Sequence, residues 1–200
     1  MRIRLVSNIG CAIAVNTGDD AIYCPAPRAL ILGIGNVLLS DEGAGIHVAN
    51  LLQRNKPGGH PVTVLDGGTL SFTLLADIAA CDQFIAVDAA ELNAQPGTVR
   101  VLEGADMDRH LRSGRKSVHE VGLADLLDMA RLTDRLPAHR ALVAIQPADL
   151  GWGDGPSPAV AGALTKAQQA VWALLDRWST FTSGVKGADT GNDHDAAKLA

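Results

Sequence analysis

The feature that most constrains the fold is a series of short apolar runs separated by turns and helical patterns. The runs lie at residues 28–34, 61–65, 84–87, 98–102 and 141–145. The first is continuously apolar from Ala29 to Leu32 and ends in glycine, which is typical of a strand buried on both faces of a parallel sheet. Apolar residues at helical spacing lie at about 45–54, 74–78, 123–130 and 160–178. Alternating strands and helices form right-handed βαβ units, so we predict an α/β three-layer sandwich, with a mostly parallel, twisted sheet of five strands and helices on both faces.

Polar segments on both sides set the predicted domain boundaries. Residues 28–182 form a single α/β domain, and a chain of 200 residues with 47% apolar positions can bury its core without a disulfide or a metal. Residues 1–27 are an N-terminal extension of undetermined order. Asn8 and Gly10 interrupt its apolar stretch, which argues against a signal peptide. Residues 183–200 are too polar to join a core and are predicted to be a disordered tail.

The composition excludes several classes of function. A net charge of −5 argues against nucleic acid or anionic lipid as the main partner, and 4% aromatic residues argue against a stacking platform. No apolar stretch approaches the roughly 20 residues of a membrane span. Cys11, Cys24 and Cys81 form no Cys-x-x-Cys pair, and no base is placed beside them, so a disulfide framework, a thiolate zinc site and a thiol nucleophile are all disfavoured. We expect a cytoplasmic protein.

Common cofactor and hydrolase motifs are incomplete. Gly33 and Gly35 begin a dinucleotide fingerprint, but the third glycine is replaced by Leu38. His119 and Glu120 begin a zinc-protease helix motif, but Leu123 stands in place of the second histidine. A generic nucleotide-binding α/β domain is therefore a weakened alternative.

Acidic residues follow the predicted strands. Glu42, Asp66 and Asp88 lie after the first three runs, and ligands bind beyond the carboxyl ends of strands in such sheets. Together with His119, Glu42 and Asp88 provide oxygen and nitrogen ligands for a borderline divalent ion such as nickel or zinc.

Each of these residues also has a purely structural interpretation. Glu42 is suited to a helix N-terminus with Ser40 or Asp41 as the cap, Asp88 to a solvated turn, and His119 to the start of a helix. His47 ranks below His119 as a ligand, because five helical positions turn it away from Glu42.

Several segments resemble, in order and spacing, the hydrogenase maturation endopeptidases. They are residues 32–45 with their G-x-G-N-x-L-x-x-D-E pattern, the Asp-Gly-Gly-Thr sequence at 66–69, Val87 with Asp88, residues 119–127, Ile145 to Pro147, and the helix that begins at Pro158. The resemblance covers about residues 29–178 and implies a five-stranded sheet between helices. It also implies a peptidase that removes a short C-terminal extension from the large-subunit precursor of a nickel–iron hydrogenase after nickel insertion.

The same resemblance implies roles for individual residues. Glu42, Asp88 and His119 become the metal ligands and catalytic residues, and they engage nickel supplied by the substrate, for which cadmium or zinc can substitute in crystals. Whether that metal is catalytic or only recognised stays open. Asp66, Gly67, Gly68 and Thr69 become substrate-binding residues; the alternative is a turn in which Thr69 caps the next helix.

The expected partner is the large-subunit precursor, bound by a monomer through a wide strand-end groove. An aromatic residue on the loop at 151–158, Trp152, is either an anchor for that partner or an exposed residue without a contact. A metal-binding chaperone that escorts the subunit without cutting it is the alternative function.

Overall fold

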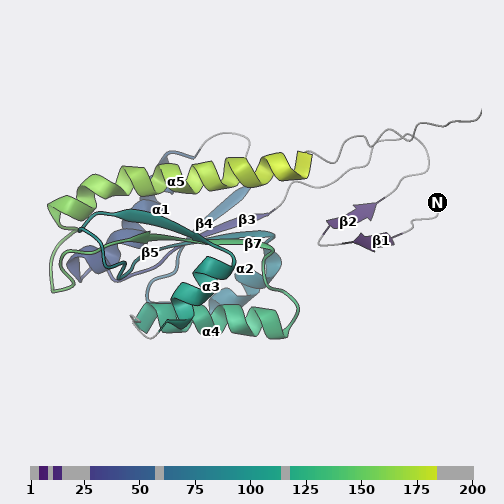
Figure 1. The fold of residues 1–200 in the computed structure, drawn as a ribbon, viewed down its shortest axis with the longest axis horizontal. Coiled ribbons are helices and arrows are strands. Elements are labelled where there is room, and N and C mark those ends of the chain that lie inside the picture. Colours follow the sequence, from purple (N-terminus) through teal and green to yellow (C-terminus); the bar gives the residue numbers. More distant parts are fainter. Residues whose placement is uncertain (1–4, 9–10, 15–27, 57–60, 114–117, 184–200) are drawn as a thin grey trace, which may run out of the picture.

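A computed structural model describes residues 5–8, 11–14, 28–56, 61–113 and 118–183, with the backbone alone described for residues 5–8, 11–14, 118–121 and 180–183. Its central sheet has the strand order β4-β3-β5-β7-β6 (Figure 1). The strands are β3 (Ala29–Gly33), β4 (Val62–Asp66), β5 (Gln83–Ala89), β6 (Val99–Glu103) and β7 (His139–Ile145). All neighbours pair in parallel except β6, which runs antiparallel to β7 at one edge. The predicted mostly parallel five-stranded sheet is confirmed.

Helices cover both faces of this sheet. On one face lie α1 (Ala44–Arg54) and the long α5 (Pro158–Ser183), and on the other lie α2 (Leu75–Ala80), α3 (Ala105–Arg112) and α4 (Val118–Leu132) (Figure 1). Alternate residues of one strand reach opposite cores: Ala29 and Ile31 pack against α1 and α5, whereas Leu30 and Leu32 pack against α2 and α4. This two-sided burial explains the continuous apolar run of β3 and confirms the predicted three layers.

Two features were not predicted. Helix α3 is mostly charged and buries only Met107 and Leu111, so its apolar pattern is too sparse to indicate a helix. Strands β1 (Leu5–Asn8) and β2 (Cys11–Ala14) form an antiparallel pair within the N-terminal extension. The rest of that extension up to residue 27, and residues 184–200 of the predicted tail, lie outside the described residues. In the described part of the chain, no helix is long and apolar enough to cross a membrane.

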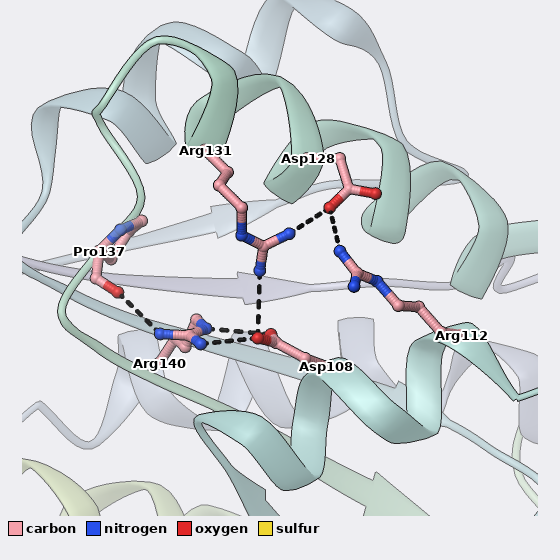
Figure 2. A network of polar contacts seen from close by, with 6 residues as sticks. All are labelled: Asp108, Arg112, Asp128, Arg131, Pro137 and Arg140. Carbon is pink, nitrogen blue, oxygen red and sulfur yellow. Dashed lines mark hydrogen bonds and ion pairs between the residues drawn. The ribbon is translucent and has the colours of Figure 1, made fainter.

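A network of ion pairs joins α3, α4 and β7 (Figure 2). The Asp108 carboxylate accepts hydrogen bonds from Nε and Nη2 of Arg140 at 3.0 and 2.7 Å and from Nη2 of Arg131 at 3.1 Å. Arg131 also pairs with Asp128, which accepts a hydrogen bond from Arg112 at 2.6 Å. The hydrogen bonds from Arg140 are the main reason that the pKa of Asp108 lies below its usual value. The network fixes the C-terminal half of α4 to the sheet.

Candidate functional site

The carboxyl ends of three neighbouring strands bring the acidic candidates to one edge of the sheet. Gly33 at the end of β3 is in register with Asp66 on one side and with Val87 on the other. Asp66 is therefore the last residue of β4, and Asp88 lies one position past that register in β5. The predicted strand-end placement of both acids is confirmed.

Two glycines explain how the segment carrying Glu42 reaches the same edge. A Cβ atom on Gly45 would lie 2.1 Å from the carbonyl oxygen of Val87, so only glycine lets the start of α1 rest on the end of β5. Gly35 has a φ of +141°, and a Cβ there would lie 1.9 Å from the Glu42 carbonyl oxygen. The short 3-10 helix η1 (Ser40–Gly43), which contains Glu42, is therefore held directly above the ends of β3 and β5.

The environments of Glu42 and Asp88 decide between the earlier interpretations. Asp88 is 1% exposed, so a solvated turn is the wrong description. Glu42 is half-buried, with its Oε2 atom buried, and it lies in the first turn of η1, as its structural interpretation expects. Neither Ser40 nor Asp41 is a cap, because η1 and α1 begin after Leu39 and Gly43 and no side-chain hydrogen bond caps either helix.

His119 is the second residue of α4, and its side chain is outside the described part of the structure. Near the start of α4, Gly122 lies close to the side chain of Leu70: a Cβ atom on Gly122 would lie 3.3 Å from Cδ1 of Leu70. His119 thus stands about one turn from the loop that follows β4. Among the side chains that are described, no group of three or more His, Cys, Asp and Glu residues is arranged to hold a metal. The combination of Glu42, Asp88 and His119 stays a prediction.

The segment from Asp66 to Thr69 forms a turn tied to β3. The Asp66 carboxylate accepts a hydrogen bond from the Gly68 amide at 2.8 Å, and the Gly67 amide donates to the Gly33 carbonyl at 2.8 Å. Thr69 does not cap the next helix; that cap is Ser71, which accepts from the Thr73 amide. A Cβ atom on Gly68 would meet nothing within 4 Å, so the space beside this turn is open, and its predicted substrate-binding role is untested.

Asp41 is a buried residue at this edge whose structural role the sequence analysis did not identify. Its side chain is fully buried and accepts hydrogen bonds from the amides of Ala148, Asp149 and Ser157, at 2.8, 2.9 and 2.6 Å, and from the Ser157 hydroxyl at 2.9 Å. Burial raises the pKa of this carboxyl, but the four hydrogen bonds outweigh it and hold the pKa below its usual value. No local pattern indicates the role, since the partners lie 107 to 116 positions away. Asp41 holds the loop between β7 and α5 beside η1.

Gln146 makes a second long-range connection at the same edge. Its Oε1 atom accepts hydrogen bonds from the amides of Leu92 and Ala94, at 2.7 and 3.3 Å. The side chain is 5% exposed and follows directly after β7. It therefore fixes the segment after β5 against the end of β7.

Cys81, the only described cysteine with a described side chain, lies at the opposite end of the sheet. It follows α2 and precedes β5, away from the strand ends that carry Asp66 and Asp88. Burial is the main cause that raises the pKa of its thiol to about 12. A thiol in that state is a poor nucleophile, in agreement with the sequence analysis.

The chain is similar in sequence to proteins that are named for hydrogenase formation or maturation. The profile of the hydrogenase maturation protease family matches residues 46–174. The chain is 32% identical over 166 residues to the hydrogenase expression/formation protein HupD of Rhizobium leguminosarum bv. viciae, with 82% of each chain covered. It is 36% identical over 150 residues to the hydrogenase 2 maturation protease of Escherichia coli K12, covering 74% of this chain and 90% of the relative.

The fold is likewise similar to a solved structure. The hydrogenase maturating endopeptidase HybD from E. coli superimposes with a TM-score of 0.71 at 34% identity, covering 76% of this chain and 93% of that chain. The α/β architecture is thus the one found in this group of peptidases, and the resemblance drawn from the motifs is confirmed.

Proposed function

Because this chain belongs to the hydrogenase maturation protease family, we propose that it removes the C-terminal extension of a nickel–iron hydrogenase large-subunit precursor after nickel insertion. The observation that carries the proposal is the seating of η1 on the ends of β3 and β5. This packing brings the segment with Glu42 to the strand end that carries Asp88. The start of α4, with His119, adjoins the neighbouring loop through Gly122 and Leu70.

The residues suit recognition of a metal that belongs to the substrate. Two carboxylates and an imidazole are an acceptable ligand set for a borderline divalent ion such as nickel. The nickel of the precursor supplies Lewis acidity, which polarises the scissile carbonyl or activates a water molecule. Glu42 or Asp88 would accept a proton from the attacking water and return it to the leaving amide nitrogen, and His119 would help to bind the nickel of the precursor. A precursor without nickel lacks the group that these side chains bind, so it is left uncut.

The test is to replace Glu42, Asp88 and His119 singly by alanine and to measure cleavage of the nickel-loaded precursor by mass spectrometry. We expect all three variants to fold and to lose cleavage. Asp125→Ala is the matched control, because Asp125 is an exposed carboxylate on α4 outside the site. Cleavage by all three variants at the parent rate would refute the assignment. A metal-dependent complex in which the subunit keeps its mass would indicate the non-proteolytic chaperone instead.

A further inference from the structure

A hollow lies beside η1 and the start of α1, on the side away from the sheet. Its volume is ≈ 560 Å³, in the range of small-molecule sites, and its lining residues are Val37, Leu38, His47, Trp152, Gly153 and Asp154. Two loops form its walls. They are joined where Leu39 pairs with Gly153 and where the Gly153 amide donates to the Leu38 carbonyl at 3.2 Å. The hollow is therefore built by fixed backbone contacts.

Large apolar side chains surround this hollow without being covered. Leu38 is 60% exposed and Trp152 is 82% exposed, although the chain buries most of its other large apolar residues. Exposed apolar side chains gathered around one concave surface are typical of an interaction site, and tryptophan is a frequent anchor residue.

His47 supplies an independent sign that a ligand binds here. Its Nε2 atom is buried and has no hydrogen-bond partner among the described residues. A buried polar atom without a partner is costly, and such an atom in a native structure calls for an explanation. Gly45 faces the sheet, and two further helical positions turn His47 by about 200°, toward the hollow. A ligand that offers a backbone carbonyl or amide would satisfy this nitrogen once the imidazole rotates to expose it to the hollow.

The charge at the mouth of the hollow narrows the chemistry of the ligand. Asp154 is exposed and forms no ion pair in the part of the chain that the structure describes, and none of the six lining residues is a lysine or an arginine. Glu42 lies in the adjoining η1, five positions before His47 in the chain. These features suit a peptide that carries an apolar side chain with a basic group close by.

We propose that this hollow is a specificity subsite for the C-terminal extension of the precursor, an inference that rests on the proposed function. An apolar side chain of the extension packs between Leu38 and Trp152, and His47 hydrogen-bonds to the peptide backbone. Asp154 pairs with a basic side chain next to that apolar residue. The subsite thus selects the segment of substrate that is presented to Glu42 and Asp88.

The first test measures kcat and KM for the nickel-loaded precursor with Leu38→Ser and Trp152→Ala. We expect KM to rise about tenfold in each variant, because an apolar contact is lost, while kcat stays within about twofold of the parent. Leu132→Ser is the matched control, because Leu132 is 85% exposed at the end of α4 and should leave both constants unchanged. If Leu38→Ser and Trp152→Ala both have the same KM as the parent, the subsite is wrong.

The second test does not depend on cleavage. Trp152 is exposed, whereas Trp172 is half-buried and Trp178 is buried, so binding of a synthetic peptide with the sequence of the extension should shift the emission of Trp152 to shorter wavelength. We expect this shift in the parent and in Glu42→Ala, and a loss of the shift in Trp152→Phe. If the parent binds the peptide but never cuts the precursor, the proposed function fails and the subsite stands. If cleavage proceeds without any shift, the subsite fails and the function stands.

The third test addresses His47. His47→Leu removes the hydrogen-bonding nitrogen at similar size, and His47→Gln restores a polar nitrogen. We expect KM to rise about fivefold in the leucine variant and to recover partly in the glutamine variant, with unchanged circular dichroism. Equal KM values for the leucine variant and the parent would show that His47 does not contact the substrate.

Discussion

Replacing Asp41 by asparagine is the most informative single change outside the proposed catalytic residues. Asparagine has nearly the same shape as aspartate, so the change removes the charge and one acceptor atom without leaving a cavity. The amide oxygen is best placed where Oδ2 now accepts three hydrogen bonds, from Ala148, Asp149 and the Ser157 hydroxyl. The amide nitrogen then faces the Ser157 backbone N–H, and two donors oppose each other.

The expected loss follows from these four contacts. A hydrogen bond to a charged group contributes about 1.5–3 kcal/mol and a neutral one about 0.5–1.5 kcal/mol, so three weakened bonds lose about 1 kcal/mol each. The unsatisfied N–H of Ser157 adds about 1–3 kcal/mol. We expect Asp41→Asn to lower the free energy of unfolding by about 4–6 kcal/mol at pH 7.

The pH dependence gives the prediction its sharpest test. The pKa of Asp41 is lowered from 3.8 by folding, so the unfolded chain binds the proton more readily, and the stabilisation is present above about pH 4. It is lost as the pH falls through the folded-state pKa, where the protonated carboxyl resembles the amide. The difference between parent and variant should therefore shrink below pH 4.

Urea denaturation followed by circular dichroism, at pH 7 and at lower pH, measures the loss of unfolding free energy and its dependence on pH. The control is Asp149→Asn, an exposed acid in the same loop, which should change stability by no more than about 0.5 kcal/mol. A loss below 1 kcal/mol at pH 7, or a loss of equal size at every pH, would refute the argument.

Two further predictions concern the glycine contact and the cysteine. Gly45→Ala places a Cβ atom 2.1 Å from the Val87 carbonyl oxygen, a backbone atom that cannot move aside. We expect this variant to lose about 3 kcal/mol or more of its free energy of unfolding, as measured by thermal melts. The control is Gly162→Ala, where a Cβ atom meets nothing within 4 Å and should not destabilise the protein. Because the pKa of the Cys81 thiol is about 12, iodoacetamide at pH 8 should leave Cys81 unmodified in the folded protein, as read by peptide mass mapping, and rapid labelling would contradict this description.

The sheet and its strand ends could be predicted because they depend on local pattern. Continuous apolar runs indicated strands such as β3 and β5, and the rule for parallel strands located Asp66 and Asp88. The antiparallel direction of β6 could not be obtained in this way, since its pairing with β7 depends on how the chain returns to the edge of the sheet.

The long-range polar contacts were also beyond the sequence analysis. The role of Asp41 depends on amides more than a hundred positions away, and that of Gly45 depends on the approach of a helix to a strand end. His119 lies in the first turn of α4, and its relation to Glu42 and Asp88 stays a prediction.

The ion pairs at the far end of α4 have a mechanical consequence. Asp128 and Arg131 tie down the last two turns of this helix, whereas His119 lies nine positions before Asp128, about 13 Å along the axis. A tilt of about 5° at the anchored end moves the first turn by about 1 Å over that length, and a misplacement of that size costs a catalytic group about a hundredfold in rate. Under the proposed mechanism, the rate of cleavage should therefore depend on Asp108, a residue of α3 outside the candidate site.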